Sequence, residues 1–493
     1  MNQYNQYKTM LQKAADINYA SAVLQWDQET YMPENGASMR ARQLATLAGY
    51  AHELSTDKHL GVLLNELIGD VKLDGQQQAN IRHSLKDYKQ RAKYPAAFVE
   101  EMSLAISKAF NSWHEAKTKN DFKLFQPDLE KLVDLKLREA DLLGYKEHPY
   151  DALLDQYEHG LTVAQIKPLF ADVRNQLVDF VKQITPMKVD SSFMHLHYPK
   201  NEQWDFGMKL LADMGYDFKA GRQDMSSHPF TTNFNSHDVR VTTRIDENNL
   251  HEMIWSTIHE GGHALYEQGL LLENYGLPMG EAVSLGIHES QSRLWENNVG
   301  RSLNYWKHYY PIIQKIFTSQ LGNVDLNTFY KAMNEVKPSF IRTNADELTY
   351  HFHIMIRFEI EVQLMEQKVK VSELPELWNA LYKEYLGIDV PSVSQGVLQD
   401  VHWSHGSLGY FPTYSIGSFY AAQFFASAKK QIPGLENQLA TGNYSELLQW
   451  LRTNIHVHGK LYSADELCNR ITGESLNFKY FMDYAKEKYL GMK

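Results

Sequence analysis

The sequence predicts a mainly α protein, a large helical body with one small antiparallel β-sheet. Gly and Pro number only 28 and 15 in 493 residues, against roughly 35 and 25 at average usage, so turns are scarce and long helices are favoured. Apolar residues recur at helical spacing through residues 1–190. Residues 190–246 differ, because they are rich in β-branched and aromatic residues that partly alternate with polar ones.

Three helices of the first part have recognisable beginnings. Ser38 is expected to cap a helix that runs through His52. Pro95 suits the start of a second helix, because its missing N–H is not needed there. Thr162, with Gln165 three residues later, matches the capping box that opens a third helix. We interpret these helices as amphipathic scaffold without chemistry of their own.

The sheet is expected to have two or three strands, at residues 193–198, 228–234 and 238–245, separated by turn-prone residues. Helical patterns resume after Glu247 and continue to the end. No repeat, low-complexity tract or flexible linker interrupts the chain. We therefore expect one domain over residues 1–493, with a helical part over 1–190 and a second part over 191–493 that holds the sheet.

Composition excludes several classes of function. The net charge of −11 argues against nucleic acid as the main partner, since phosphate binding needs clustered Lys and Arg. The single cysteine, Cys468, excludes an intrachain disulfide, thiolate zinc clusters and iron–sulfur centres. The polar N-terminal segment lacks the apolar core of a secretory signal, and no run approaches the ~20 apolar residues of a membrane span. A soluble cytoplasmic protein is expected.

One segment carries a metal-binding pattern, HEGGH at residues 259–263. His259 and His263 are four residues apart, so on a helix both imidazoles face one zinc ion, and Glu260 lies close to the metal-bound water. Composition alone predicts at most about 0.1 chance matches to this pattern in the chain. Apolar residues at helical spacing surround the motif, and this context favours a zinc site over a coincidence.

Two adjacent glycines, Gly261 and Gly262, fall inside the motif. Each weakens a helix by ~1 kcal/mol relative to Ala, so helix formation alone does not explain them. Close approach of a substrate or of a neighbouring helix explains them, and so does a tight packing contact.

A catalytic zinc needs a third protein ligand and leaves a fourth position open. The extended motif with Gly and His three and six residues after the second His fails, because Tyr266 and Gly269 stand there. A Glu on a following helix is the expected ligand, and the candidates are Glu267, Glu273, Glu281, Glu289 and Glu296. We favour Glu289, which lies in a helical stretch that a loop can fold back over the first helix, with Glu296 as the lesser alternative. His288 is interpreted as a packing residue, or as one that contacts a metal ligand without binding the metal itself.

Eight segments together resemble one known family. They are WDQETYMP at 26–33, RARQLA at 40–45, HPF at 228–230, DVRVT at 238–242, HEGGH at 259–263, HESQ at 288–291, IRTNADE at 341–347 and GVLQDVHW at 396–403. Their order and spacing are similar to those of the thermostable carboxypeptidase, or carboxypeptidase Taq, family of zinc metallopeptidases. The similarity extends over most of the chain.

The resemblance implies His259, His263 and Glu289 as metal ligands, with residues 191–493 as the catalytic part. It also implies a helical body with a deep substrate groove beside the small sheet, and a homodimer. Members of the family release single amino acids from peptide C-termini with broad preference, act poorly on C-terminal proline, and use zinc or cobalt. The expected partners are peptides with a free C-terminus, and neither nucleic acid nor a membrane.

The expected reaction is peptide hydrolysis by a metal-bound water, with Glu260 as the base that takes the water proton and passes it to the leaving amine. The oxyanion needs further donors. His402 and Tyr414 are the candidates, with Tyr410 nearby. Ordinary packing is the alternative for both tyrosines, since the chain has 29.

An exopeptidase must also bind a free carboxylate, for which the guanidinium fork of Arg is suited. Arg342 is the candidate, and the alternative is a structural ion pair with Asp346, four residues later. The resemblance places Gln399 and His402 near Arg342. Arg240 and His228 either line the groove or support the sheet.

Two rival functions are considered. The first is an oligopeptidase that cuts inside short peptides, because the zinc motif is shared with such enzymes. The second is a helical binding protein with a structural metal site. An intact Glu260 argues against the second, because a structural site has no use for a base.

Overall fold

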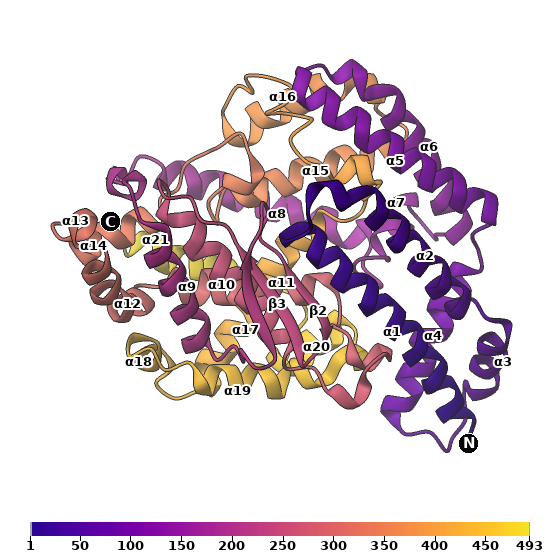
Figure 1. The fold of residues 1–493 in the computed structure, drawn as a ribbon. Helices are drawn as coiled ribbons and strands as arrows, with labels where there is room; N and C mark the ends of the chain where they lie inside the picture. Colours follow the sequence, from indigo (N-terminus) through magenta and orange to yellow (C-terminus); the bar gives the residue numbers. More distant parts are fainter. Residues whose placement is uncertain (1, 493) are drawn as a thin grey trace. The chain divides into compact units, whose positions relative to one another are not determined.

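The computed structural model describes residues 2–492, in which helices predominate and one three-stranded sheet is present, as the mainly α prediction states (Figure 1). The chain forms two compact units, each built from three segments. The first unit contains the residues up to Ala92, Val189–Met333 and Tyr420–Asn477. The second contains Lys93–Lys188, Asn334–Phe419 and the residues from Phe478 onward. The single domain over residues 1–493 stays a prediction.

The first unit holds the sheet and most of the helices before and after it. Its helices are α1 Gln3–Thr30, α2 Ala37–Ser55, α3 Lys58–Leu67, α4 Gly75–Arg91, α9 Lys200–Met214, α10 Leu250–Glu267, α11 Leu285–Arg293, α12 Leu303–Ile316, α13 Thr318–Leu321, α14 Leu326–Met333, α18 Leu435–Ala440, α19 Ser445–Asn454 and α20 Ala464–Thr472. A π-helix, Leu294–Gly300, directly extends α11.

Within the residues that the structure describes, the regular elements of the second unit are all helices. Its helices are α5 Ala96–Lys119, α6 Gln126–Leu143, α7 Pro149–Leu154, α8 Val163–Ile184, α15 Tyr350–Met365, α16 Leu374–Leu386 and α21 Lys479–Leu490. Helix α17, Pro412–Gln431, begins in the second unit and ends in the first. No helix within residues 2–492 has both the length and the apolar character that crossing a bilayer requires.

Two of the three predicted helix beginnings are confirmed. Pro95 is the N-cap of α5, and Thr162 is the N-cap of α8, where the Gln165 side chain accepts a hydrogen bond from the Thr162 N–H at 3.0 Å. The prediction for Ser38 is wrong. Helix α2 begins at Ala37 after a 3₁₀ turn with Gly36 as its N-cap, so Ser38 lies inside the helix.

The sheet has three strands, β1 Gly221–Met225, β2 Thr231–Asn235 and β3 Asp238–Thr243, in the order β1-β3-β2. The antiparallel prediction holds for β2 and β3, but β1 pairs with β3 in parallel, so the sheet is mixed. Strand β1 was missed, because its sequence GRQDM has low β-propensity. Its first residue, Gly221, lies so close to the carbonyl of Val239 that a Cβ would be only 2.0 Å from that oxygen.

The predicted strand at residues 193–198 is wrong. Ser192–His195 form a 3₁₀ helix instead. The Asp190 carboxylate accepts hydrogen bonds from both the backbone N–H and the hydroxyl of Ser192, at 3.0 and 2.7 Å. Such local side-chain bonds compete with strand pairing and favour a turn.

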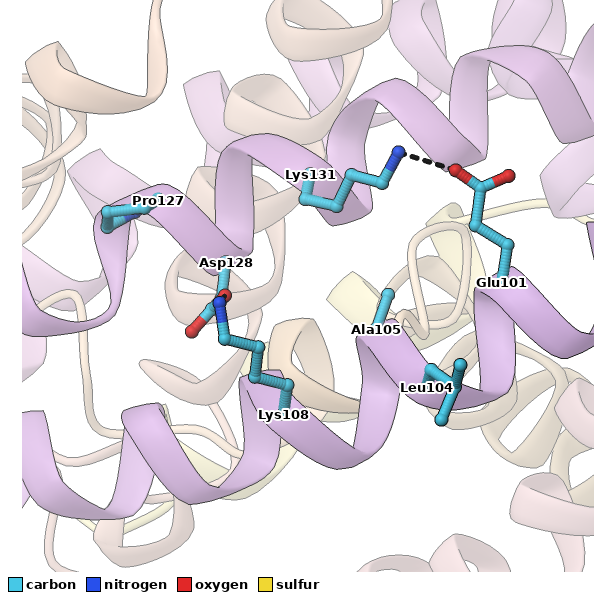
Figure 2. A pocket seen from close by; sticks show the side chains of 7 residues that line it. All are labelled: Glu101, Leu104, Ala105, Lys108, Pro127, Asp128 and Lys131. Carbon is cyan, nitrogen blue, oxygen red and sulfur yellow. Dashed lines mark hydrogen bonds and ion pairs between the residues drawn. The ribbon is translucent and has the colours of Figure 1, made fainter.

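Figure 2 shows a surface pocket of about 340 Å³ between α5 and α6. It is lined by Glu101, Leu104, Ala105, Lys108, Pro127, Asp128 and Lys131. Two ion pairs cross it, Lys131 with Glu101 at 2.6 Å and Lys108 with Asp128 at 2.8 Å. No residue that the sequence predicts for the site lies in this pocket.

Candidate metal centre

Helix α10 carries the HEGGH motif and is buried along most of its length. The Asn249 side chain caps it by accepting a hydrogen bond from the His251 N–H at 3.2 Å. The helix packs against α9, α11, β2 and β3 (Figure 1). As predicted, His259 and His263 share one face, and their ring centroids lie 4.9 Å apart.

The two glycines mark close packing against neighbouring helices. A Cβ on Gly262 would be 2.7 Å from the carbonyl oxygen of Gln291 and 2.7 Å from the Cα of Ser292, both on α11. A Cβ on Gly261 would be 2.7 Å from a methyl group of Leu211 on α9. Of the explanations that the sequence left open, the structure supports helix packing. Gly262 in particular lets α11, which carries Glu289, approach α10.

Gly262→Ala is expected to lower the free energy of unfolding by about 1–3 kcal/mol, because the new methyl group meets rigid backbone and overpacks the contact. It should also weaken metal binding, since α11 must move. Gly49→Ala is the matched control: Gly49 also lies inside a helix, and a Cβ there meets nothing within 4 Å. That change is expected to stabilise by about 0.5–1 kcal/mol. Equal stability of both variants in chemical denaturation would contradict this explanation.

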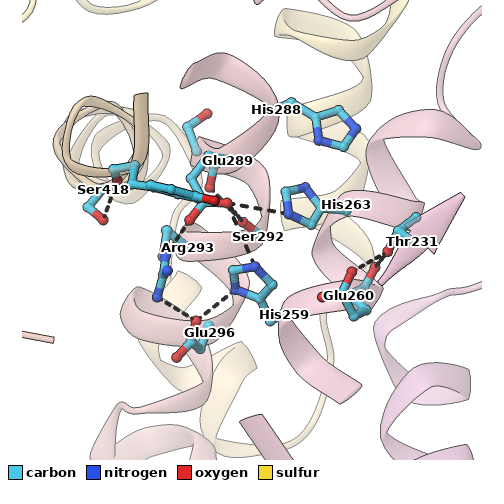
Figure 3. A network of polar contacts seen from close by, with 12 residues as sticks. Thr231, His259, Glu260, His263, His288, Glu289, Ser292, Arg293, Glu296 and Ser418 are labelled. Atoms are coloured by element: carbon cyan, nitrogen blue, oxygen red, sulfur yellow. Dashed lines mark hydrogen bonds and ion pairs between the residues drawn. The ribbon is translucent and has the colours of Figure 1, made fainter. Parts of the chain in front are cut away.

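Glu289, the residue that the sequence favours, lies beside the two imidazoles and forms a three-residue donor set with them; its role as a metal ligand stays a prediction. Ser284 caps α11 by accepting a hydrogen bond from the Ile287 N–H at 3.1 Å. One carboxylate oxygen of Glu289 lies 3.7 Å from the Nε2 of His259 and 3.4 Å from the Nε2 of His263. Tetrahedral zinc with bonds of about 2.0–2.1 Å separates its ligand atoms by roughly 3.3 Å. The donor set of His259, His263 and Glu289, whose ligand atoms lie within 4.8 Å of one another, therefore fits a metal ion (Figure 3).

Three of the other candidate glutamates, Glu267, Glu273 and Glu281, lie outside this donor set. Glu267 accepts a hydrogen bond from the side chain of Asn233 and lies 2.8 Å from the Nε2 of His288. Glu281 forms an ion pair with Lys460, and Glu273 is exposed.

Glu296 contacts His259 from the side away from Glu289. It lies on the π-helix that extends α11, and its carboxylate is 2.9 Å from the Nδ1 of His259. This contact occupies Nδ1 and leaves the Nε2 of His259 available to a metal ion. Arg293 connects the two glutamates: its Nε donates to Glu289 at 2.6 Å and its Nη1 to Glu296 at 3.1 Å (Figure 3). A second guanidinium, that of Arg301, donates to Glu296 at 2.9 Å.

The charges of this cluster favour an ionised Glu289. Burial raises its pKa, but Arg293 and the two imidazoles outweigh burial and hold the pKa well below its usual range. Burial lowers the pKa of His263 to about 3, so this imidazole is neutral, the form that binds a metal. Burial also lowers the pKa of His259, but the carboxylates of Glu289 and Glu296 outweigh it and raise the pKa.

Glu260 lies on α10 between the two histidines and is 93% buried. Burial raises its pKa, while His259 and a hydrogen bond from Thr231 oppose that shift. The Thr231 hydroxyl donates to one carboxylate oxygen of Glu260 at 2.6 Å (Figure 3). The carboxylate is therefore held on one side by β2 and has a second oxygen for other contacts.

His288 packs on the metal-binding face, as predicted. Its ring stacks on that of His263, with centroids 4.4 Å apart. Its Nε2 lies 2.8 Å from a carboxylate oxygen of Glu267. His288 thus limits the rotation of the His263 ring without belonging to the donor set.

A second group of predicted residues lies together in the second unit, around Arg342. The Arg342 guanidinium donates to Asp400 at 3.0 Å and to the hydroxyl of Tyr350 at 3.0 Å, and it is 92% buried. Its backbone N–H donates to the Gln399 side chain at 2.8 Å. The other oxygen of Asp400 accepts from Arg357, which is fully buried. One carboxylate is therefore shared by two arginines.

The alternative ion pair between Arg342 and Asp346 is wrong. The Asp346 carboxylate instead accepts hydrogen bonds from the backbone N–H groups of Lys337, Leu348 and Thr349 at 2.9–3.0 Å. It therefore fixes the loop before α15 and leaves Arg342 to Asp400.

His402, Tyr410 and Tyr414 also cluster in the second unit. The Nε2 of His402 lies 3.2 Å from the hydroxyl of Tyr414, and its ring centroid is 5.5 Å from that of Tyr410. The Arg342 guanidinium lies 5.1 Å from the ring centroid of Tyr414. Burial lowers the pKa of His402 to about 3, so the imidazole is neutral.

Arg240 and His228 are placed on or beside the sheet. Arg240 forms a two-point ion pair with Asp238 at 2.9 Å, and its guanidinium lies 4.4 Å from the ring centroid of Trp26. His228 is exposed. Support of the sheet accounts for the contacts of Arg240, and a substrate contact of either residue stays a prediction.

Sequence reasoning missed several residues that shape the two clusters. Arg293 stands four residues after Glu289, a spacing that signals an ion pair on a helix. Asp400 and Arg357 are neighbours only in the fold. His456 is fully buried with its Nε2 3.0 Å from Gln291, and no local pattern marks that contact.

Comparison with known proteins adds independent information. The model of the family described as "Carboxypeptidase Taq (M32) metallopeptidase" matches residues 6–489. Carboxypeptidase 1 of Bacillus subtilis is 41% identical, over 97% of this chain and 96% of its own. Thermostable carboxypeptidase 1 of Thermus thermophilus is 39% identical, over 99% of this chain and 98% of its own. The crystal structure of the M32 carboxypeptidase of Deinococcus radiodurans R1 superimposes with a TM-score of 0.98 at 39% identity, covering 100% of this chain and 99% of that one.

Proposed function

Because the chain belongs to the carboxypeptidase Taq (M32) family of metallopeptidases, it is a metallocarboxypeptidase, and we propose that its metal is zinc, held by His259, His263 and Glu289. The observation that carries the proposal is the donor set itself: two imidazoles and one carboxylate at spacings suited to a tetrahedral ion. Cobalt is expected to substitute. Elemental analysis of the protein as purified tests this choice, and a different resident metal would contradict it.

A bound ion of this kind supplies a Lewis acid, which makes water nucleophilic at neutral pH and polarises a carbonyl group. The residues of the chain do the rest. We assign Glu260 as the general base that takes a proton from the attacking water and delivers it to the leaving amine. Its carboxylate is buried, and Thr231 occupies only one of its oxygens. The other oxygen is the one assigned to proton transfer.

We further propose that His402 and Tyr414 stabilise the oxyanion that develops on the scissile carbonyl. Their ring nitrogen and hydroxyl lie 3.2 Å apart and share a hydrogen bond, and this bond has to open before both groups can donate to an oxyanion. Removing one such donor typically costs 10²–10³-fold in kcat. Tyr410, whose ring packs on both residues, is proposed as a substrate contact.

Arg342 is proposed to bind the free C-terminal carboxylate of the peptide. A guanidinium has five N–H donors, and within residues 2–492 the structure gives Arg342 two partners, Asp400 and Tyr350. Asp400 holds the Nε end of the guanidinium, and the Gln399 side chain holds the backbone N–H of Arg342. The remaining N–H donors of the guanidinium are held in a fixed planar arrangement that can bind both oxygens of a carboxylate. The ammonium group of a lysine offers only a point charge.

Arg342→Lys is expected to lower kcat/KM on peptides with a free C-terminus by about 10–100-fold, because the charge beside Asp400 remains while the fork is lost. Cleavage of the same peptides with an amidated C-terminus, already slow, should change little. Arg174→Lys, on the partly exposed surface of α8, is the matched control and should leave both rates unchanged. An equal loss on free and amidated peptides would make Arg342 a structural residue.

The finer features of the activity also remain proposals. We expect single residues to be released with broad preference and poor action on C-terminal proline, by a cytoplasmic homodimer. The competing proposal, an oligopeptidase that cuts inside short peptides, predicts internal fragments. Digestion of one free-ended and one C-terminally blocked peptide, with the products read by mass, separates the two. Sedimentation or light scattering measures the oligomeric state.

A further inference from the structure

We propose that Thr231 is a positioning residue for Glu260: its hydroxyl holds one carboxylate oxygen so that the other is aimed for proton transfer. This inference rests on the proposed role of Glu260 as the base. It also gives the HPF and DVRVT segments a role in holding the base, besides the support of the sheet by Arg240.

The contact is short and specific. The Thr231 Oγ1 lies 2.6 Å from Oε2 of Glu260 and 3.0 Å from the Glu260 backbone oxygen. A hydroxyl has a single proton, and the shorter, charge-assisted bond to the carboxylate is the stronger of the two. Thr231 is the first residue of β2, and β2 packs against α10. A strand residue therefore fixes a side chain of the metal-binding helix.

The neighbouring residues fix Thr231 in turn. The N–H of Phe230 donates to the Thr242 hydroxyl at 2.9 Å, and the Thr242 N–H donates to the Phe230 carbonyl at 2.9 Å. The Ser226 hydroxyl lies 2.7 Å from that of Thr242. In the strand register Thr231 is opposite Val241, directly beside this bonded pair. The end of the HPF segment is thus tied to the end of the DVRVT segment immediately before Thr231.

This arrangement matters because the backbone of α10 alone leaves the Glu260 side chain free to rotate. A base must keep its oxygen within hydrogen-bond reach of the proton it takes. With one oxygen held by β2, rotation of the carboxylate would break a buried, charge-assisted bond. A structural alternative is that Thr231 only satisfies a buried carboxylate, in which case its loss lowers stability and not the rate.

Thr231→Val and Thr231→Ser separate the two explanations. Val removes the hydroxyl at nearly constant size, and Ser retains it. For Thr231→Val we expect kcat to fall about 10–100-fold, the range that a lost charge-assisted hydrogen bond of 1.5–3 kcal/mol predicts. KM should stay within about twofold and the metal content should stay full, because the Thr231 hydroxyl bonds Glu260, which is outside the donor set. Thr231→Ser should recover kcat to within about threefold of the natural enzyme.

Thr232→Val is the matched control. Thr232 is the next residue of β2, so its side chain projects to the opposite face of the sheet. The Thr232→Val change should leave kcat, KM and the melting temperature unchanged. If Thr231→Val does not fold, Thr231→Ala compared with Thr231→Ser at equal melting temperature gives the same test.

The outcomes distinguish this inference from the proposed function on which it rests. Full kcat in Thr231→Val, with Glu260→Gln inactive, overturns the role of Thr231 and leaves the base intact. A drop in melting temperature or metal content without a drop in kcat per bound metal supports the structural alternative. That result also overturns the positioning role of Thr231. Activity in Glu260→Gln overturns the base itself. If both roles are correct, adding Thr231→Val to Glu260→Gln lowers kcat no further, because the two residues act as a unit.

Discussion

Glu260→Gln is expected to lower kcat by about 10²–10⁴-fold while the metal stays bound. The amide keeps the size of the side chain and can still accept the Thr231 hydrogen bond, but it cannot take a proton. The three donor atoms of the metal site belong to other residues, so metal content measured on the variant should equal that of the natural protein. Turnover of a free-ended peptide, followed by mass or by released amino acid, gives kcat.

Glu252→Gln is the control for this change. Glu252 lies in the first turn of the same helix and pairs with Arg244 at 3.3 Å, away from the metal ligands. Its replacement should leave kcat within about twofold. If Glu260→Gln keeps full activity with full metal content, then Glu260 is not the base.

Glu289→Gln should strongly lower the affinity of the site for its metal ion. The carboxylate supplies the only negative charge among the three donors, and its loss leaves two imidazoles, which carry no negative charge, to hold a divalent ion. Loss of a residue that merely supports a ligand typically weakens metal binding 10–100-fold, so loss of a ligand is expected to weaken it by more than about 100-fold. Competition with a chromophoric chelator measures the affinity directly, without reference to activity.

Glu296→Gln is the comparison that makes this result informative. Glu296 is as deeply buried and shares Arg293 with Glu289, but it touches the far nitrogen of His259. Its amide oxygen can still accept that hydrogen bond, so the metal affinity should fall by no more than about 10–100-fold. A greater loss of metal in Glu296→Gln than in Glu289→Gln would make Glu296 the third ligand.

The parts of the fold that follow from local sequence were predictable. The capping box at Thr162 and the proline before α5 act within one turn, and both helices begin where these residues predict. Strand β1 was not predictable, because GRQDM becomes a strand only through its pairing with β3. The prediction for residues 193–198 failed for the opposite reason: the composition suits a strand, but the hydrogen bonds that Ser192 donates to the Asp190 carboxylate favour a turn.

The candidate site likewise contains residues that local sequence predicts and residues that only tertiary packing brings into place. His259, Glu260 and His263 are within one turn of each other, so helical geometry alone brings them together. Glu289 had to be chosen among five glutamates, since its distance from the histidines depends on the packing that Gly262 allows. The role of Glu296 depends on the π-helix after α11, where an extra residue in the turn changes which side chains face α10. No pattern in a single sequence marks that change.

The most direct test of the metallocarboxypeptidase assignment is the mass of the products from one free-ended peptide, measured before chelation, after chelation and after zinc is restored. For a metallocarboxypeptidase we expect a ladder of peptides shortened one residue at a time from the C-terminus. The ladder should disappear with the metal and return with zinc, and it should stay absent in Glu260→Gln under all three conditions. Internal fragments, or shortening that persists after the metal has been removed, would contradict it.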